Sequence, residues 1–240
     1  MQADNQQVWR LIPHLEAPGQ VQMAIDKWLL EQHLLGHPSS LRFYTWSPSA
    51  ISLGYHQRQY PEYWGNLRWR GDKLDLVQRP TGGRAVLHQD DLTYAVVTSG
   101  LVGNRVQVYK KICEFLIQGW RSLNVELHYG TAGRGYIHNP NCFGTATDAD
   151  LVTSDGCKLI GSAQLRRGKA ILQHGSMRLQ PNAELFTAVF GTDLTSVQLP
   201  QNLDLETIIT ALVAAAIDCF HIQFVLQPLS SDEWKQILAE

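Results

Sequence analysis

The sequence has little of several features that each mark a class of protein, and cysteine is the first of them. Only four of the 240 residues are cysteines, and they form neither a CxxC pair nor the Cys/His spacing of a zinc site. So few cysteines in a chain of this length do not suggest the disulfide framework that stabilises small secreted domains. We therefore expect free thiols and no metal site.

Net charge and long apolar runs are also scarce. The formal net charge is −2 and the basic residues are scattered, so the basic stripe of a nucleic-acid-binding protein is missing. The longest apolar run, IITALVAAAI, is too short to span a bilayer, and the opening residues MQADNQQVWRLIP lack the basic and apolar regions of a signal peptide. These absences predict a cytoplasmic protein that binds neither nucleic acid nor membrane.

The chain does contain enough apolar material for one large core. Hydrophobic residues make up 44% of it, and no linker, repeat or low-complexity segment divides it. This composition favours a single domain over residues 1–240.

Four segments have helical patterns. Apolar residues recur on one helix face in residues 21–35, 105–123 and 205–220, and the expected inward residues include Val106 and Ile217. A fourth helix is expected to begin at Ser230, whose hydroxyl can form a capping box with Glu233.

Strand-like segments lie between these helices. Turn signals at residues 154–156 and at Arg167-Gly168 divide the segment 150–179 into three strands that should pair in series. Because strands cluster instead of alternating strictly with helices, we expect an α+β fold with a mixed, largely antiparallel sheet flanked by helices. The other expected strands are residues 41–46, 50–54, 74–78, 85–88, 93–98 and 125–129.

The segment VQRPTGGRAVLH, residues 77–88, combines a glycine pair with two arginines. The glycines let the backbone turn sharply and let a ligand approach the main chain, while the arginines could hold a phosphate or a carboxylate. The alternative is a tight turn with both arginines in solvent and an ordinary histidine at the end of a strand. The candidate binding residues of this segment are Arg79, Thr81, Gly82, Gly83, Arg84 and His88.

The four cysteines differ in their surroundings. Cys142 lies in the polar, turn-rich segment HNPNCFGTATD, where a thiol has no packing reason to occur, so it is a candidate nucleophile unless its exposure is accidental. Cys113 and Cys219 fall on or beside apolar helix faces and are expected to be small buried hydrophobes. Neighbours on a strand point to opposite faces, so Cys157 should not share a site with Lys158, whereas Cys142 could.

The segment CKLIGSAQLRRGKAILQHGSM places small residues inside an otherwise apolar hairpin. Such residues weaken a strand unless something must come close to it. Cross-strand pairing is expected to bring the polar residues of Gln173–Ser176 together with Gln164. The alternative is a polar face in solvent. The candidate binding residues of this hairpin are Gly161, Ser162, Ala163, Gln164, His174 and Gly175.

Five segments occur in the order MAIDKWLLEQ, LRFYTWSPSAISLGYHQ, RPTGGRAVLHQDDLTYAVV, NPNCF and KLIGSAQLRRGKAILQHGS. Together they resemble the lipoate and octanoate protein ligase and transferase family, and most closely its LipM-type octanoyltransferases. The likeness spans roughly residues 20–190. It implies a fold like the catalytic domains of lipoate and biotin protein ligases, with the segment 200–240 packed on it.

The resemblance also implies roles for individual residues. Cys142 matches the cysteine that carries the acyl group as a thioester, and Lys158 matches the family lysine that approaches the acyl carbonyl and favours the thiolate. The glycine-rich segment 79–88 matches the loop that holds the acyl group and its phosphopantetheine arm. Arg84 stands where ATP-dependent lipoate ligases usually have a third glycine, which disfavours an adenylate pocket.

The implied reaction moves an octanoyl group from octanoyl-acyl-carrier protein, through Cys142, to a lysine of a lipoyl domain, and it needs no cofactor. The implied acceptors include the glycine cleavage H protein and the acyltransferase subunits of 2-oxoacid dehydrogenases. Three alternatives stay open: an ATP-dependent lipoate-protein ligase using ATP and magnesium, an amidotransferase that moves octanoyl between lipoyl domains, and a non-catalytic module that binds the acyl group or its carrier.

Overall fold

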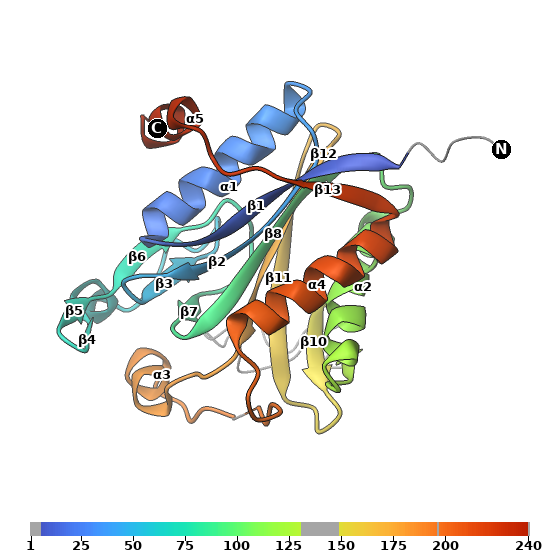
Figure 1. Ribbon diagram of the computed structural model, residues 1–240. Coiled ribbons are helices and arrows are strands. Elements are labelled where there is room, and N and C mark those ends of the chain that lie inside the picture. The colour runs from blue at the N-terminus through green and yellow to red at the C-terminus, as the bar shows by residue number, and fades with distance from the viewer. Residues whose placement is uncertain (1–5, 131–148, 196, 240) are drawn as a thin grey trace.

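The computed structural model describes residues 6–130, 149–195 and 197–239. Figure 1 shows how the helices and strands of these residues are arranged. The helices are α1 (Gly19–Leu34), α2 (Arg105–Ser122), α3 (Ala183–Phe190), α4 (Leu205–Phe220) and α5 (Ser231–Leu238), with a short 3-10 helix at Glu62–Asn66. The strands are β1 (Gln7–Ala17), β2 (Ser40–Trp46), β3 (Ala50–Leu53), β4 (Arg68–Trp69), β5 (Asp72–Lys73), β6 (Asp75–Gln78), β7 (Val86–His88), β8 (Asp91–Ser99), β9 (Leu127–Tyr129), β10 (Asp150–Thr153), β11 (Lys158–Arg167), β12 (Ala170–Arg178) and β13 (Ile222–Leu226).

One eight-stranded sheet with the order β13-β1-β2-β8-β12-β11-β10-β9 runs through the molecule. β13 pairs with β1, and β1 with β2, in parallel, and the other described pairings of this sheet are antiparallel. The prediction of an α+β fold with a mixed, largely antiparallel sheet is confirmed. The strands β10, β11 and β12 pair in series as expected, and their turns hold Gly156 and Gly168 at positive φ.

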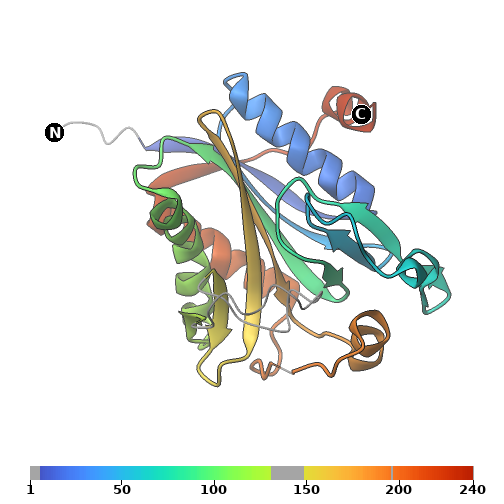
Figure 2. The same ribbon diagram turned by 180° about the vertical axis from the view of Figure 1, so that it is seen from behind.

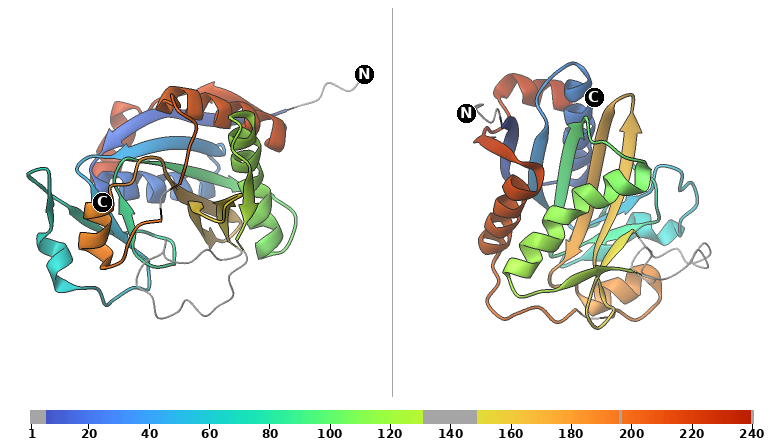
Figure 3. Two further views of the ribbon diagram at one scale, coloured as in Figure 1. Left: turned by 90° about the horizontal axis from the view of Figure 1, so that it is seen from below. Right: turned by 90° about the vertical axis from the view of Figure 1, so that its right-hand side faces the viewer.

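Helices cover both faces of this sheet. α1 lies against one face, and α2 and α4 lie against the other, as Figure 3 shows. Tyr94 and Val96 of β8 belong to the core on the side of α2 and α4, whereas Ala95 and Val97 belong to the core on the side of α1. Because successive side chains of a strand point to opposite faces, a central strand buried on both sides needs apolar residues at nearly every position.

Most helices lie where the sequence predicts them. The segments 105–123 and 205–220 form α2 and α4, and Ser230 and Glu233 form the expected capping box of α5. The prediction that Val106 and Ile217 face inward is wrong, because their side chains are 58% and 37% exposed. Val106 lies about 200° around the helix from the buried Val108 and so points away from the sheet. None of the described helices is long and apolar enough to cross a membrane.

The strand β1 is the main element that the sequence does not predict. Pro13 lies inside β1, and the pairing with β2 shifts register between Ile12 and Leu15, so the chain is irregular where proline has no N–H to donate. Arg10 of β1 donates to the two carboxylate oxygens of Glu233 at 2.7 and 2.9 Å. This ion pair holds α5 beside the N-terminal strand.

A second sheet, with the order β6-β3-β7, lies beside the N-terminal end of α1 (Figure 2). Its core includes Trp64 and also Phe186 of α3, a helix that the sequence does not predict. β6 ends at Gln78 and β7 begins at Val86. The residues 79–85 between them, here called the glycine loop, therefore join two strands of this small sheet.

The glycine loop packs against the end of β3 through two glycines. A Cβ atom at Gly54 would overlap the carbonyl oxygen of Gly83, and Gly83 itself has a φ of +99°. A side chain at Gly54 has no room, and a side chain at Gly83 would be strained. The close approach of these two backbones fixes where the loop lies.

Gly54→Ala should therefore lower the free energy of unfolding by about 1–3 kcal/mol, because the added methyl group must push β3 and the loop apart. Gly65→Ala is the matched control, since a Cβ atom there meets no other atom within 4 Å. Urea unfolding of both variants measures the difference. Equal unfolding midpoints for the two variants would contradict the tight contact.

Candidate active site

Two predicted motifs that are far apart in the sequence meet at one cavity. The cavity has a volume of about 440 Å³. Residues of the glycine loop and of the small-residue part of β11 both line it. Its lining residues are Gly82, Gly83, Arg84, Arg105, Tyr109, Ala149, Asp150, Ser162, Ala163 and Gln164.

Lys158 does not line this cavity itself but forms an ion pair with a residue that does, Asp150. The sequence analysis does not predict this acidic partner. The side chain of Lys158 is buried, and its Nζ lies 2.8 Å from Oδ1 of Asp150. The guanidinium of Arg178 donates to the backbone carbonyl of Lys158. Both the side chain and the backbone of Lys158 are thus held in place. Cys142, the predicted nucleophile, lies outside the described residues.

Of the other cysteines, Cys113 is buried as predicted, whereas Cys219, also predicted to be buried, is only partly buried. Cys113, Cys157 and Cys219 are free within the described part of the chain. Burial raises the pKa of Cys113 to about 12 and that of Cys219 to about 11, so both stay protonated near neutral pH. Burial also raises the pKa of Cys157. None of these three has the lowered pKa of an activated thiol.

Arg79 shapes the glycine loop from within. Its guanidinium donates to the backbone carbonyls of Ser52 at 2.8 Å, Gly82 at 2.9 Å and Arg84 at 2.7 Å. The alternative in which both arginines of this segment lie in solvent is therefore wrong for Arg79. Of the two arginines, Arg84 is the one that lines the cavity.

A buried chain of hydrogen bonds ties the loop to α1. Oγ1 of Thr81 lies 2.6 Å from Nε2 of His174, and Nδ1 of His174 lies 2.7 Å from Oδ2 of Asp26. Asp26 is also bound by Nε of Arg42 at 3.0 Å and by the hydroxyl of Tyr44 at 3.0 Å. We call Thr81, His174 and Asp26 the α1 chain.

Asp26 is ionised in spite of its complete burial. Burial alone would raise the pKa of this carboxyl group, but Arg42, His174 and Tyr44 together hold the pKa below its ordinary value. Nδ1 of His174 therefore carries the proton that it shares with Asp26, which sets the orientation of the ring. The sequence does hold a signal for this residue, because Asp26 lies on the same helix face as the buried Met23 and Leu30.

A second buried chain reaches the same loop from the other sheet. Nδ1 of His88 lies 2.8 Å from Oδ2 of Asp91, and Nε2 lies 2.8 Å from Oγ of Ser52, whose backbone carbonyl binds Arg79. The His88 ring stacks on Trp46 with 3.8 Å between the centroids. We call Ser52, His88 and Asp91 the β7 chain.

The two chains share the order hydroxyl, imidazole and carboxylate with the triads of hydrolases. In hydrolases the hydroxyl must be open to substrate. Here Thr81 and Ser52 are each 1% exposed, and neither lines the cavity described above. The arrangement therefore positions the loop and does not present a nucleophile.

The β11–β12 hairpin divides its polar residues between the two faces of the sheet. Gln164 pairs with Gln173 in register, and their side chains are joined by a hydrogen bond of 2.9 Å. His174 points to the opposite face, into the α1 chain, so the prediction that cross-strand pairing gathers all these residues at one place is wrong. Because successive side chains of a strand point to opposite faces of the sheet, Gln173 and His174 lie on different faces.

Small residues of this hairpin are required by close packing. A Cβ atom at Gly175 would overlap Oγ of Ser162 and lie 2.7 Å from the carbonyl oxygen of Gly161. The Ser162 hydroxyl accepts a hydrogen bond of 2.8 Å from Tyr94. Ser162 and Ala163 line the cavity, whereas Gly175 makes room for the side chains that shape it. In the described parts of the chain, no group of three or more His, Cys, Asp and Glu residues could hold a metal ion.

His88 should make stability depend on pH. Burial lowers the pKa of His88 below its ordinary value of 6.5, against the opposing influence of Asp91. In the unfolded chain the His88 imidazole takes up a proton near pH 6.5, whereas in the folded chain it does so only at lower pH. The contribution of neutral His88 to the free energy of unfolding is therefore fully present above pH 6.5 and is lost as pH falls. The free energy of unfolding between pH 7.5 and 5 should fall less steeply in His88→Gln than in the unaltered protein.

The exposed His56 supplies the control, and His56→Gln should keep the full slope. Urea unfolding at several pH values gives the slope for each protein. If His88→Gln and the unaltered protein lose stability in parallel, His88 is not the group that resists protonation.

Sequence comparison relates the chain to proteins of known family. The Lipoyl protein ligase A/B catalytic domain family matches residues 18–215. Octanoyltransferase LipM of Kyrpidia tusciae is 34% identical over 248 aligned residues, which cover 98% of this chain and 85% of that protein. Octanoyltransferase LipM of Moorella thermoacetica is 39% identical over 191 residues, which cover 76% of this chain and 69% of that protein.

Solved structures show the same fold. Lipoate-protein ligase A bound with ATP superposes with a TM-score of 0.76 at 21% identity, over 96% of this chain and 92% of that chain. A bi-partite lipoate protein ligase from Thermoplasma acidophilum, studied with its E2 lipoyl domain, gives a TM-score of 0.75 at 19% identity, over 97% of this chain and 91% of that chain. Because the family model matches residues 18–215 and the LipM proteins are 34–39% identical, the chain belongs to the lipoyl protein ligase A/B catalytic domain family.

Proposed function

We propose that the protein is an octanoyltransferase that moves an octanoyl group from octanoyl-acyl-carrier protein to a lysine of a lipoyl domain. The observation that carries the proposal is the meeting of the glycine loop and the Ser162–Gln164 part of β11 at one cavity, with the Lys158–Asp150 ion pair at its wall. The LipM relatives are named octanoyltransferases, and the Thermoplasma ligase was studied with its E2 lipoyl domain.

The reaction has two steps in this proposal. The thiolate of Cys142 attacks the thioester carbonyl of the donor, a new thioester forms on Cys142, and the carrier thiol leaves and takes up a proton. The amine of the acceptor lysine then attacks this thioester, an amide forms, and the Cys142 thiol is regenerated. Each step exchanges one acyl bond for another, so it needs neither ATP nor a metal ion.

Lys158 is proposed to favour the thiolate and to position the acyl carbonyl. A thiol with an ordinary pKa of about 8.5 is only a few per cent ionised near neutral pH, and a nearby cation increases that fraction. Asp150 compensates part of the Lys158 charge at 2.8 Å. The influence of Lys158 on a thiol should therefore be smaller than that of a lysine without a carboxylate partner.

The walls of the cavity suit an acyl chain and the end of its carrier arm. Gly82, Gly83 and Ala163 present backbone and small side chains, and Tyr109 is held by hydrogen bonds from its hydroxyl to the carbonyls of Ala149 and Ser162. Backbone N–H groups near the glycine pair are candidates for binding the oxyanion of each step.

Intact mass measurement tests the proposal most directly. After mixing with octanoyl-acyl-carrier protein, the protein should gain one octanoyl group without ATP, and this gain should be lost in Cys142→Ser. Cys113→Ser is the matched control and should keep the gain, because Cys113 is buried and protonated. An octanoyl gain that needs ATP would favour the lipoate-ligase alternative, and an unchanged gain in Cys142→Ser would remove Cys142 from the mechanism.

Lys158 can be tested through the reactivity of the thiol. In Lys158→Ala, the midpoint of Cys142 alkylation by iodoacetamide should move up by as much as about one pH unit, and transfer at pH 7 should fall about tenfold or more. Lys158→Arg keeps the charge in a bulky planar group, so it should retain more of the alkylation profile than of the transfer activity.

Lys169→Ala is the control for this pair, since Lys169 is exposed in the turn between β11 and β12. It should leave the alkylation profile and the transfer rate unchanged. An alkylation profile that is the same in Lys158→Ala and in the unaltered protein would show that Lys158 does not promote ionisation of the thiol.

A further inference from the structure

β6 is an edge strand of the small sheet, and its free edge lies next to the glycine loop. It pairs in parallel with β3, with Asp75 opposite Ala50 and Gln78 opposite Leu53. The N–H of Asp75 donates to Ser49 at 3.0 Å, and the N–H of Arg79 donates to Leu53 at 2.9 Å. Because backbone groups alternate in direction along a strand, those of Leu76 and Gln78 point to the outer edge.

This outer edge carries unused hydrogen-bonding groups. Within the described parts of the chain, the N–H and carbonyl groups of Leu76 and Gln78 make no hydrogen bond. The Gln78 side chain is exposed and donates to the carbonyl of Tyr55 at 2.9 Å. A row of unpaired backbone groups of this kind accepts another extended chain, unless something covers it.

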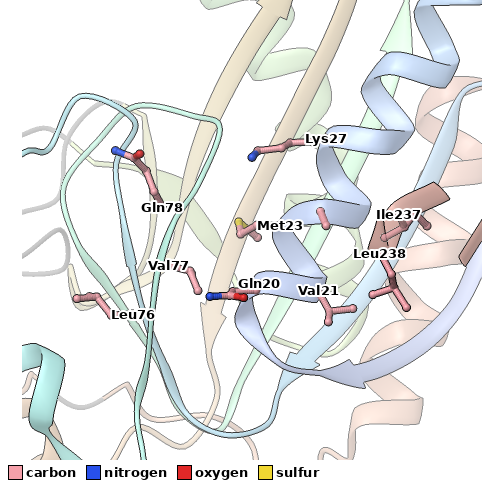
Figure 4. Close-up of a pocket in the computed structure, with 10 residues that line it drawn as sticks. Gln20, Val21, Met23, Lys27, Leu76, Val77, Gln78, Ile237 and Leu238 are labelled. Atoms are coloured by element: carbon pink, nitrogen blue, oxygen red, sulfur yellow. The ribbon is translucent and has the colours of Figure 1, made fainter. Parts of the chain in front are cut away.

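Among the described residues, the β6 residues Leu76, Val77 and Gln78 line a groove. Figure 4 shows it between β6, the first turns of α1 and the end of α5. Its volume is about 380 Å³. Met23 and Val77 form an apolar floor, and Lys27 and Gln78 stand on facing sides. The remaining lining residues are Gln20, Val21, Ala24, Leu76, Ile237 and Leu238.

We propose that this groove is the docking site of the acceptor: an extended segment of the lipoyl domain pairs with the outer edge of β6. The proposal rests on the octanoyltransferase function proposed above. Main-chain hydrogen bonds to Leu76 and Gln78 supply the attraction, and the apolar floor receives one side chain of the added strand. Lys27 suits a partner segment that carries a carboxylate.

The position of β6 favours the acceptor over other occupants. β6 runs directly into the glycine loop, and Gly82, Gly83 and Arg84 of that loop line the candidate active cavity. A segment paired with β6 therefore lies next to the loop that lines this cavity, where the proposed transfer needs an acceptor lysine. The phosphopantetheine arm of the donor is not an extended peptide, so it suits a strand edge less well than a polypeptide segment does. A second copy of this chain would not by itself supply the acceptor lysine of a lipoyl domain.

The variant Gln78→Pro tests the edge with little other disturbance. It removes the outward N–H of Gln78 and leaves the hydrogen bonds between β6 and β3 intact. A position on an edge strand whose N–H points outward is one that tolerates proline. Formation of the octanoyl-enzyme from octanoyl-acyl-carrier protein should stay within about twofold. The kcat/KM for transfer to an apo lipoyl domain should fall about tenfold, which corresponds to one lost hydrogen bond.

Gln78→Ala is the matched control, because it removes the same side chain and keeps the N–H, and it should transfer at nearly the unaltered rate. Lys27→Glu should weaken transfer as well. If Gln78→Pro transfers as fast as Gln78→Ala, the edge is not the docking site. If neither the unaltered protein nor any variant forms the octanoyl-enzyme, the result contradicts the proposed function and does not test the docking site separately.

Amide hydrogen exchange of the unaltered protein gives a test that does not depend on folding of a variant. Addition of an apo lipoyl domain should slow exchange at Gln78 and Leu76 and leave exchange at Val77 unchanged, because the backbone N–H of Val77 points to β3. Unchanged exchange at Leu76 and Gln78 would overturn the proposal. If exchange at Leu76 and Gln78 instead slows when the concentration of this protein is raised without a lipoyl domain, the edge binds a second copy of this chain and the proposal is wrong.

Discussion

The buried carboxylate of Asp26 is the constraint on which the candidate site depends. It is completely buried and binds Arg42, Tyr44 and His174, so removing any one partner would leave a charge or a polar group without compensation in a low-dielectric interior. Through His174 it holds Thr81 of the glycine loop. The conformation of the loop is thus coupled to the packing of α1 on the sheet, and not only to the glycines within it.

The sheet separates positioning from binding. On the α1 face of β12, His174 belongs to the chain that holds the loop, whereas on the α2 face Gln173 binds Gln164, which lines the cavity. One strand can serve both purposes because its side chains alternate between faces. The same rule explains why β12 is buried along its whole length although four of its nine residues are polar. Each polar group finds a partner in one of two interiors.

The sequence predicts the elements whose signals are local. The capping box of Ser230, the turns at Gly156 and Gly168, and the helices α2 and α4 follow from neighbouring residues. The strand β1 escapes prediction because Pro13 interrupts its pattern and its partners lie far along the chain. The pairing of Lys158 with Asp150, and of His174 with Asp26, also depends on contacts between distant segments. Motif resemblance locates the site, but its supporting carboxylates come only from the three-dimensional structure.

The glycine loop lies between two recesses with different chemistry. On one side Gly82, Gly83 and Arg84 line the candidate cavity, and on the other the chain leads into β6 and its open edge. The proposed transfer brings two proteins to one acyl group, so it needs the two proposed binding places held in a defined relative position. The α1 chain and the β7 chain anchor the loop at Thr81 and, through Ser52, at Arg79. The stiffness of a loop built from two glycines thus comes from buried residues on either side of it, and this stiffness fixes the separation between cavity and strand edge.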